Sequence, residues 1–295
     1  MPMLYHLVTL GCQMNISDGE RVESVLEDMG YVQTDREEDA DVLGILSCSV
    51  RQKPIDKVYS KIHEWNEWKK EKRLITFISG CILPRDKDNL LKLFDLMFPM
   101  SELSKLPDMI RKQGIVMGEG MEDPIKSLPQ NKHIEEFWSI KPRYRSSFEA
   151  YVPIQNGCDK FCTFCAVPYT RGREVSRPSG DILRQVEDLI NKDYKSITLL
   201  GQNVNSYGKD KKEGEEIGFP ELLRRVGELG LRSGKEFWVY FTSPHPWDMS
   251  HEVIRAVADY PHLARQIHLP LQSGDDKILL KMNRKHSVEE YRKIV

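Results

Sequence analysis

The chain begins with the β-prone run Leu4-Tyr5-His6-Leu7-Val8-Thr9-Leu10, which leads directly into Gly11-Cys12. A helical pattern then extends from Ser17 to about Met29 and is followed by Gly30. A short apolar run bounded by glycine predicts a strand, and Ser17 is the expected N-cap of the helix. The first thirty residues therefore predict one βα unit with a cysteine between its two elements.

The same unit recurs twice. Residues 41–46 form an apolar run that leads to Cys48 and to a helical pattern from about 54 to 72. Residues 74–78 lead to Cys81 and to a further helix. Successive cysteines lie 36 and 33 residues apart, which is the length of a βα unit. Strands that alternate with helices predict a parallel sheet with right-handed crossovers.

Each of these cysteines is expected just past the carboxyl end of its strand, where ligand sites of open α/β sheets lie. The chain holds six cysteines, at positions 12, 48, 81, 158, 162 and 165. Six disulfide partners are unexpected in a cytoplasmic chain, whereas three thiolates at one sheet edge indicate a metal or iron–sulfur site. Scattered buried thiols are the alternative.

The second half opens with a strand over 150–155, followed by Asn156-Gly157-Cys158-Asp159-Lys160-Phe161-Cys162-Thr163-Phe164-Cys165. Three cysteines on one loop can face a single ion or cluster, and Gly157 allows a tight turn into it. A structural zinc site would need a fourth ligand, and no further cysteine or histidine lies nearby. Further strands are expected over 196–200, 236–242 and 266–271.

Composition fits a folded protein of two domains. The 295 residues are 40% hydrophobic and 30% charged, which excludes wholesale disorder and fibrous structure. No apolar run approaches the ~20 residues that span a bilayer, and no secretory signal is visible, so we expect a cytoplasmic protein without a membrane partner. Residues 1–130 carry a net charge of −5 and residues 131–295 one of +3, which permits a nucleic-acid partner without requiring one.

The cysteine loop resembles the signature of radical S-adenosylmethionine (SAM) enzymes, and other segments narrow the resemblance. These segments are 9–15, 168–178, 200–208, 268–274 and 281–284. In order and spacing they resemble the methylthiotransferase family over nearly the whole chain. Gly11-Cys12-Gln13-Met14-Asn15 and Cys48-Ser49-Val50-Arg51 are most similar to the members that act on N6-isopentenyladenosine in tRNA. Ser47 departs from the Asn-Thr that commonly precedes the second cysteine there.

The resemblance implies an α/β fold in which an N-terminal parallel-sheet domain precedes a radical SAM partial (β/α) barrel. We expect the first domain over 1–120, a linker over 121–145, and the radical SAM core over 146–295. The four strands predicted in the second half fall short of the six that this barrel normally has. The core is therefore expected to be incomplete at its C-terminus, without the RNA-binding TRAM domain, and the chain to be a fragment.

The resemblance also implies two 4Fe–4S clusters and S-adenosylmethionine as cofactors. Cys158, Cys162 and Cys165 would hold the cluster that binds S-adenosylmethionine, and Cys12, Cys48 and Cys81 an auxiliary cluster that carries the sulfur. The implied reaction adds a methylthio group to C2 of N6-isopentenyladenosine at position 37 of tRNA, next to the anticodon. Alternatives are the same chemistry on threonylcarbamoyladenosine or on a ribosomal-protein aspartate, and an inactive iron–sulfur-binding or zinc-binding fragment.

Other polar and aromatic residues are candidate contacts to S-adenosylmethionine, although no catalytic residue beyond the cluster ligands is assigned. Gln202, Asn203 and Asn205 follow a strand, with local turn capping as the alternative. Phe164 would pack near the adenine or simply within its loop. Arg171 and Arg173 suit a carboxylate or the tRNA backbone, with an ion pair to Glu174 as the alternative. Gln272 and His268 flank the strand expected over 266–271, where hydrogen-bonded structural roles are the alternative.

Implied partners are tRNA, a reductant of the flavodoxin or ferredoxin type, and a sulfur source. The protein is expected to be a monomer. Lys209, Lys211 and Lys212 are interpreted first as a solvated loop and second as a weak RNA contact. Trp65 and Trp68 share one face of the expected helix over 54–72 and are predicted to be core residues rather than base-stacking ones.

Overall fold

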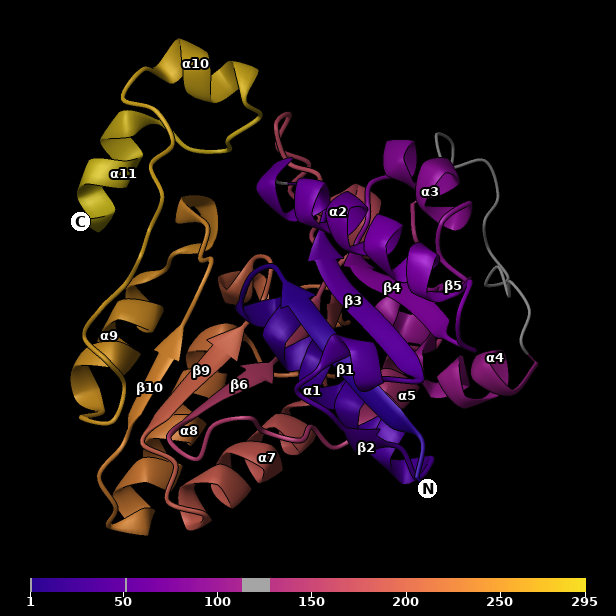
Figure 1. The fold of residues 1–295 in the computed structure, drawn as a ribbon. Coiled ribbons are helices and arrows are strands. Elements are labelled where there is room, and N and C mark those ends of the chain that lie inside the picture. The colour runs from indigo at the N-terminus through magenta and orange to yellow at the C-terminus, as the bar shows by residue number, and fades with distance from the viewer. Residues whose placement is uncertain (1, 51, 113–127) are drawn as a thin grey trace. The chain divides into compact units, whose positions relative to one another are not determined.

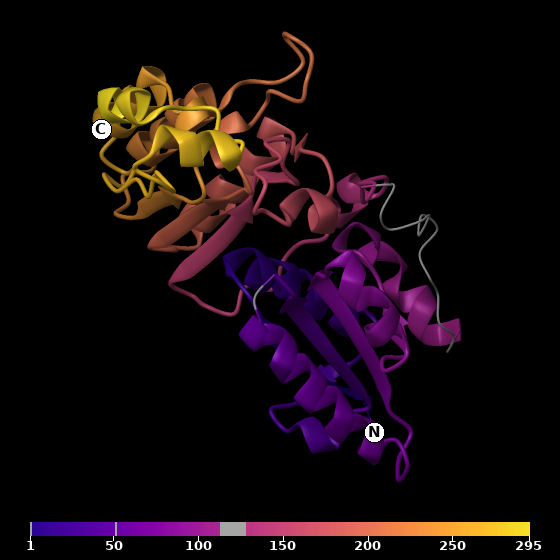
Figure 2. The same ribbon diagram turned by 90° about the horizontal axis from the view of Figure 1, so that it is seen from above.

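The computed structural model describes residues 2–50, 52–112 and 128–295. It divides into two compact units, whose elements are followed in Figure 1 and, from above, in Figure 2. The first unit holds Met1–Arg145 together with the short segment Tyr169–Gly172. The second holds Ser146–Pro168 and Arg173–Val295.

The first unit is built on a five-stranded parallel sheet of order β2-β1-β3-β4-β5. Its strands are β1 (Leu4–Leu10), β2 (Val32–Gln33), β3 (Val42–Cys48), β4 (Ile75–Cys81) and β5 (Leu96–Met97). The three long strands are those predicted from the repeated βα units, and they are neighbours at the centre of the sheet. In the register of β3 and β4, Cys48 lies directly beside Cys81.

Helices α1 (Gln13–Asp28) and α2 (Gln52–Trp68) pack against β3 from its two faces. Successive side chains of a strand point to opposite faces. Leu43 and Ile45 join the core with α2, whereas Leu46 lies against α1 at Gly19. The tryptophans of α2 confirm their predicted core role: Trp65 is fully buried and Trp68 packs at the edge of the same cluster. The remaining helices of this unit are α3 (Pro84–Leu91), α4 (Leu106–Lys112) and α5 (Ile134–Ser139).

The predicted start of the first helix was wrong. The helix begins at Gln13 with Cys12 in the N-cap position, and no side chain caps it. Ser17 lies one turn inside the helix, is buried, and accepts a hydrogen bond from Arg21 at 3.0 Å. Because the packed face of α1 reaches back to the strand end, tertiary burial rather than capping sets the first turn.

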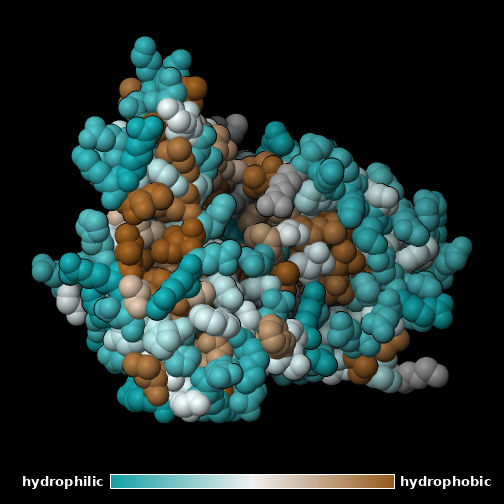
Figure 3. Space-filling view, turned by 90° about the vertical axis from the view of Figure 1, so that its left-hand side faces the viewer, coloured by the Kyte–Doolittle hydropathy of each residue, from teal (hydrophilic) through white to brown (hydrophobic). Residues whose placement is uncertain are grey.

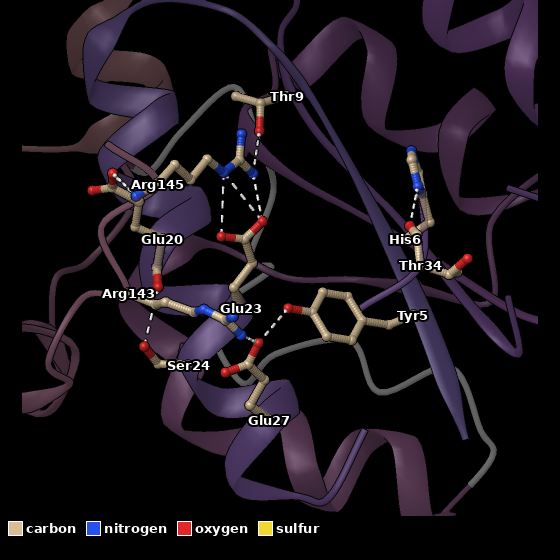
Figure 4. A network of polar contacts seen from close by, with 10 residues as sticks. All are labelled: Tyr5, His6, Thr9, Glu20, Glu23, Ser24, Glu27, Thr34, Arg143 and Arg145. Atoms are coloured by element: carbon tan, nitrogen blue, oxygen red, sulfur yellow. Dashed lines mark hydrogen bonds and ion pairs between the residues drawn. The ribbon is translucent and has the colours of Figure 1, made fainter. Parts of the chain in front are cut away.

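Part of the predicted linker is folded onto the first unit. Residues 121–127 lie outside the described residues, but 128–145 belong to this unit and include α5. Figure 4 shows how the end of this segment is held on α1. Arg145 donates to the Glu23 carboxylate at 2.7 Å, and Arg143 pairs with Glu27. The chain therefore leaves the first unit along α1, pinned by ion pairs that the polar composition of the segment did not reveal.

The second unit has a three-stranded parallel sheet of order β10-β9-β6, together with a small antiparallel pair, β7 and β8. The strands are β6 (Glu149–Pro153), β7 (Gln155–Asn156), β8 (Val175–Ser176), β9 (Ser196–Leu200) and β10 (Trp238–Phe241). The helices of this part of the chain are α6 (Val167–Arg171), α7 (Ser179–Asn191), α8 (Phe219–Ser233), α9 (His251–Asp259), α10 (Asp276–Lys281) and α11 (Val288–Ile294). Helix α7 packs on β6 and on α8, which in turn packs on α9.

The strand predicted over 266–271 is absent from the structure. Only Leu263 pairs with β10, in a single parallel bridge to Val239. Pro270 has no N–H to donate to a ladder. The carbonyl groups of Leu269 and Pro270 accept hydrogen bonds from the side chains of Tyr291 and Arg284 instead, at 2.7 and 3.3 Å. Side-chain hydrogen bonds thus replace strand pairing in this segment.

The surface is mostly hydrophilic, with local apolar patches on the face shown in Figure 3. Large exposed apolar side chains of the second unit include Phe148, Trp238, Trp247 and Leu280. Within the described residues, every helix is too short or too polar to cross a membrane.

Candidate functional site

The three cysteines of the first unit meet at the carboxyl edge of its sheet. Cys12 follows β1 at the start of α1, while Cys48 and Cys81 are the last residues of β3 and β4. Because β1, β3 and β4 are adjacent and parallel, their carboxyl ends lie on the same edge. The structure therefore places these cysteines as the repeat of βα units predicted.

Asn15 connects the three strand ends. Its side-chain oxygen accepts a hydrogen bond from the Cys12 thiol at 3.5 Å, and its Nδ2 donates to the Ser47 carbonyl at 3.0 Å. A Cβ on Gly80 would lie 2.8 Å from that Nδ2 and 2.4 Å from the Ser47 carbonyl oxygen. Gly80 also has a φ of +104°, which L side chains rarely adopt. Close backbone approach at Gly80 thus allows Asn15 to contact the residues next to Cys48 and Cys81.

The thiol of Cys81 is buried and hydrogen-bonded. A hydrogen bond with Cys48 and desolvation by burial raise its pKa well above the ordinary value, against the opposing charge of Arg171. Arg171 donates from Nε to the Cys81 Sγ at 3.1 Å. Without metal this cysteine is therefore a neutral thiol at neutral pH, and metal binding must release its proton.

Arg171 lies in the first unit although it follows the second cysteine group in sequence. Its Nη2 donates to Asp18 on α1 at 2.6 Å, and the two side chains are 6% and 1% exposed. Burial acts to lower the pKa of the guanidinium, but Asp18 and Cys81 together raise it. Its partners Asp18 and Cys81 belong to the first cysteine site, and the predicted contact of Arg171 with S-adenosylmethionine stays a prediction.

The second cysteine group lies on the loop that follows β7. Gly157 enters this loop with a φ of +81° and donates its N–H to the side chain of Gln202 at 2.6 Å. Cys158 and Cys162 are buried and Cys165 is half-buried, and the Cys165 N–H donates to the Cys162 carbonyl at 2.9 Å. Burial raises the pKa of Cys158 to about 12 and also raises that of Cys165.

A second segment, just after α10, holds this loop in place. The Thr163 N–H donates to the Met282 carbonyl at 3.1 Å, and Asn283 Nδ2 donates to the Phe161 carbonyl at 2.9 Å. Arg284 donates from Nη1 to the Cys162 Sγ at 3.5 Å. Residues 281–284 carry part of the family resemblance but were not predicted to lie at the cysteine site. A sequence signal for them is the polar pair Asn283-Arg284, which follows the short helix α10 and its C-cap residue Met282.

The amides predicted to contact S-adenosylmethionine are held by protein partners. Gln202 anchors Gly157, as described above. Asn203 Nδ2 donates to Asp248 at 2.8 Å, and the side chain of Asn205 exchanges two hydrogen bonds with the main chain of His245 at 2.8 and 2.9 Å. These residues follow β9 and β10, so the loops at the carboxyl edge of this sheet are tied to one another.

A buried carboxylate joins the cysteine loop to these strand ends. Asp248 is 1% exposed and pairs with Lys160, between the first two cysteines of the loop, at 2.6 Å and with Lys209 at 2.7 Å. Burial opposes ionisation, but hydrogen bonds from Asn203 and the two lysines lower the pKa of Asp248 below its usual value. The Lys209 amine thus has a defined partner rather than belonging only to a solvated loop.

Several buried polar atoms near the same edge have no hydrogen-bond partner among the described residues. They include both amide atoms of Gln155, the Oδ1 atom of Asn203 and the Nε2 atom of His245. Burial and the nearby Arg284 lower the pKa of His245 to about 3, so its ring is neutral. Unpaired polar atoms of this kind are costly unless a ligand or water satisfies them. They fit a polar ligand such as S-adenosylmethionine, with its amino, carboxylate and hydroxyl groups.

The other residues predicted to contact S-adenosylmethionine are exposed at the surface of the second unit. Phe164 is 52% exposed, and Gln272 is exposed with a φ of +72°. Arg173 pairs with Asp159 at 2.7 Å. Glu174, which the sequence suggested only as an ion-pair partner of the arginines, is buried: burial raises its pKa to about 7, and Ser206 donates to it. The roles of Phe164, Gln272 and Arg173 toward S-adenosylmethionine stay predictions.

Both cysteine sets have the chemistry that an iron–sulfur cluster requires. Each offers three soft thiols at the carboxyl edge of a parallel sheet. Among residues 2–50, 52–112 and 128–295, no three Cys, His, Asp or Glu side chains are close enough to hold a single metal ion. A four-iron cluster does not require its thiolates to meet at one ion, because each thiolate binds a separate iron.

Comparison with known proteins assigns the two units to families. The "Uncharacterized protein family UPF0004" matches residues 4–98, and the "Radical SAM superfamily" matches residues 152–295. One solved structure, a radical S-adenosylmethionine methyltransferase, TsrM, from Kitasatospora setae with cobalamin and a [4Fe-4S] cluster bound, shares the fold with a TM-score of 0.64. The two sequences are 13% identical, and the match covers 100% of this chain and 66% of the TsrM chain.

Curated relatives make the assignment narrower. Two of these relatives are named tRNA-2-methylthio-N(6)-dimethylallyladenosine synthase. The protein from Psychrobacter is 37% identical, and the match covers 97% of this chain and 59% of the relative. The protein from Thermotoga petrophila is 37% identical, and the match covers 98% of this chain and 62% of the relative. The protein of that name from Clostridium perfringens is 38% identical over 99% of this chain and 64% of its own. The chain belongs to the radical SAM superfamily. Within it, the chain is a member of the methylthiotransferase family that these relatives represent.

Members of the radical SAM superfamily use a 4Fe–4S cluster and S-adenosylmethionine, which confirms the predicted cofactor class. The parallel-sheet α/β fold is confirmed as well. The chain spans about 60% of the length of the curated relatives it matches.

Proposed function

We propose that this chain carries the catalytic portion of a tRNA methylthiotransferase. The reaction would add a methylthio group to C2 of N6-isopentenyladenosine at position 37, next to the anticodon. The names of the relatives, which specify a tRNA methylthio-dimethylallyladenosine product, support the substrate. Cytoplasmic location, a monomeric state, a flavodoxin-type or ferredoxin-type reductant and an external sulfur source stay part of the proposal.

The observation that carries this proposal is the presence of two separate cysteine triads, one in each compact unit. In the proposal, Cys158, Cys162 and Cys165 hold the cluster for S-adenosylmethionine, and Cys12, Cys48 and Cys81 hold the auxiliary cluster. When bound, the first cluster supplies the electron for cleavage of S-adenosylmethionine and the second supplies a site for sulfur. One triad alone would suit radical chemistry, whereas methylthio transfer also needs a place that presents sulfur.

The protein's own part is to position and shield these groups. Gln202 and Asn283 hold the backbone of the cysteine loop on two sides, so its thiols stay in one arrangement. The unpaired atoms of Gln155, Asn203 and His245 are available to hydrogen-bond S-adenosylmethionine. Nδ1 of the neutral His245 ring accepts from the Trp247 N–H at 3.1 Å, so Nε2 carries the proton and can donate one hydrogen bond without repelling the sulfonium.

The first test is anaerobic reconstitution of the full chain and of two variants, in which either triad is replaced by alanine. We expect iron and sulfide for two clusters in the parent chain and for one in each variant. The parent chain should cleave S-adenosylmethionine to 5′-deoxyadenosine. Of the two variants, only the one that keeps Cys158, Cys162 and Cys165 should do so. Each triple variant serves as the matched control for the other. Absence of this cleavage in the parent chain would instead support an inactive iron–sulfur-binding fragment.

The second test is nucleoside analysis of tRNA by mass spectrometry after the chain is expressed in a strain that lacks the modification. A methylthio group on N6-isopentenyladenosine is expected. Its appearance on threonylcarbamoyladenosine, or on a ribosomal-protein aspartate, would assign the alternative substrates.

A further inference from the structure

The buried ion pair of the first unit touches a predicted cluster ligand. Arg171 donates one N–H to the Cys81 Sγ at 3.1 Å and another to the Asp18 carboxylate at 2.6 Å. The guanidinium is 6% exposed and the carboxylate 1% exposed. Water therefore screens this charge little, and its effect on a neighbouring group is larger than that of a surface arginine.

The backbone of Arg171 is fixed independently of its side chain. Asn131 donates from Nδ2 to the Arg171 carbonyl at 3.1 Å. Gly172 follows with a φ of +79°, and a Cβ there would lie 2.2 Å from the Pro129 carbonyl oxygen. Arg171 is thus held at both ends: Asn131 and the close approach at Gly172 fix its backbone, and Asp18 binds its guanidinium group.

We propose that Arg171 is a positioning residue that raises the reduction potential of the cluster bound by Cys12, Cys48 and Cys81, through its N–H···S hydrogen bond and its buried positive charge. This inference rests on the proposed function, in which these cysteines hold the auxiliary cluster. Hydrogen bonds to cluster sulfurs and nearby net charge are two of the factors that set such potentials. A reduced cluster carries one more negative charge, so both factors stabilise the reduced state.

Asp18 acts in the opposite direction. Its carboxylate offsets the charge of Arg171, so Asp18→Asn should raise the potential while Arg171→Gln lowers it. The double variant Asp18→Asn with Arg171→Met removes the pair without a net change of charge and leaves only the lost hydrogen bond. It also avoids an unpaired buried carboxylate, which by itself could unfold the unit.

The experiment uses the full chain with Cys158, Cys162 and Cys165 replaced by alanine, so that only the first triad can take iron. Each variant is reconstituted anaerobically, and its potential is measured by redox titration with electron paramagnetic resonance. Arg36→Gln, which changes an exposed arginine of the first unit, is the matched control and should leave the potential unchanged. We also expect iron loss to a chelator to be about 10-fold faster in Arg171→Met than in the parent chain.

Opposite shifts for Asp18→Asn and Arg171→Gln support the proposal, because a merely structural role would not give them opposite signs. Normal iron loading with an unchanged potential in Arg171→Gln overturns this proposal but leaves the proposed function standing. Failure of the parent chain itself to take up iron on the first triad overturns the auxiliary cluster, and this inference with it.

Discussion

Gly80 is the position at which a single methyl group should disturb the first cysteine site most. Gly80→Ala would place a Cβ 2.4 Å from the carbonyl oxygen and 3.0 Å from the amide nitrogen of Ser47, both of them backbone atoms that cannot turn away. The third neighbour, Asn15 Nδ2 at 2.8 Å, can move only by giving up its hydrogen bond to the Ser47 carbonyl.

The cost of this substitution has two parts, and the chain offers a control that separates them. Gly30 has a φ of +86° with no atom within 4 Å of its Cβ position, so Gly30→Ala should cost only the left-handed backbone strain of about 1–2 kcal/mol. Gly80→Ala adds overpacking of about 1–3 kcal/mol. We therefore expect the free energy of unfolding of the first unit to fall by about 2–5 kcal/mol for Gly80→Ala.

The assay is urea unfolding of the full chain, followed by hydrogen exchange of peptides from β3 and β4. Iron uptake by the first triad is measured in the same variants. Gly80→Ala should reduce this uptake, because a displaced Asn15 no longer holds the Cys12 thiol, whereas Gly30→Ala should not. Equal losses of stability in the two variants, or full iron uptake by Gly80→Ala, would refute the reasoning.

Three further predictions concern buried groups. Burial raises the pKa of Glu20 to about 7, above its ordinary value of 4.5, so the folded state binds this proton more tightly than the unfolded state does. The free energy of unfolding should therefore fall by roughly 3 kcal/mol as pH rises from about 4.5 to 7. Glu20→Gln should remove this pH dependence when unfolding is measured across the same range, and an unchanged pH dependence would contradict the prediction. Trp65→Ala should cost about 3–5 kcal/mol in urea unfolding, since the side chain is fully buried, and a cost near that of a surface substitution would contradict the packing. Asp248→Asn should leave Lys160 without its buried anionic partner and loosen the second cysteine loop, which faster hydrogen exchange over 157–165 would show; protection equal to that of the parent chain would count against it.

The sequence predicted the three long strands of the first unit closely, because each is an apolar run bounded by polar or glycine residues. It failed where local signals were weak or misleading. Ser17 has the side chain of an N-cap yet lies inside α1, and the run 266–271 looks like a strand yet its carbonyls bind side chains. In both places tertiary hydrogen bonds and packing outweighed local propensity.

The sequence by itself determined the six cysteines, their division into two triads, and the repeated βα unit that brings distant thiols to one sheet edge. These follow from chain order and from the periodicity of apolar residues, which are local properties. Only the tertiary structure decided which polar groups surround the thiols. Arg171 is six residues from Cys165 in sequence but hydrogen-bonds Cys81, ninety residues away. The contacts of a buried guanidinium with a carboxylate or a thiol depend on packing between distant segments. The spacing of residues in the sequence therefore does not predict them.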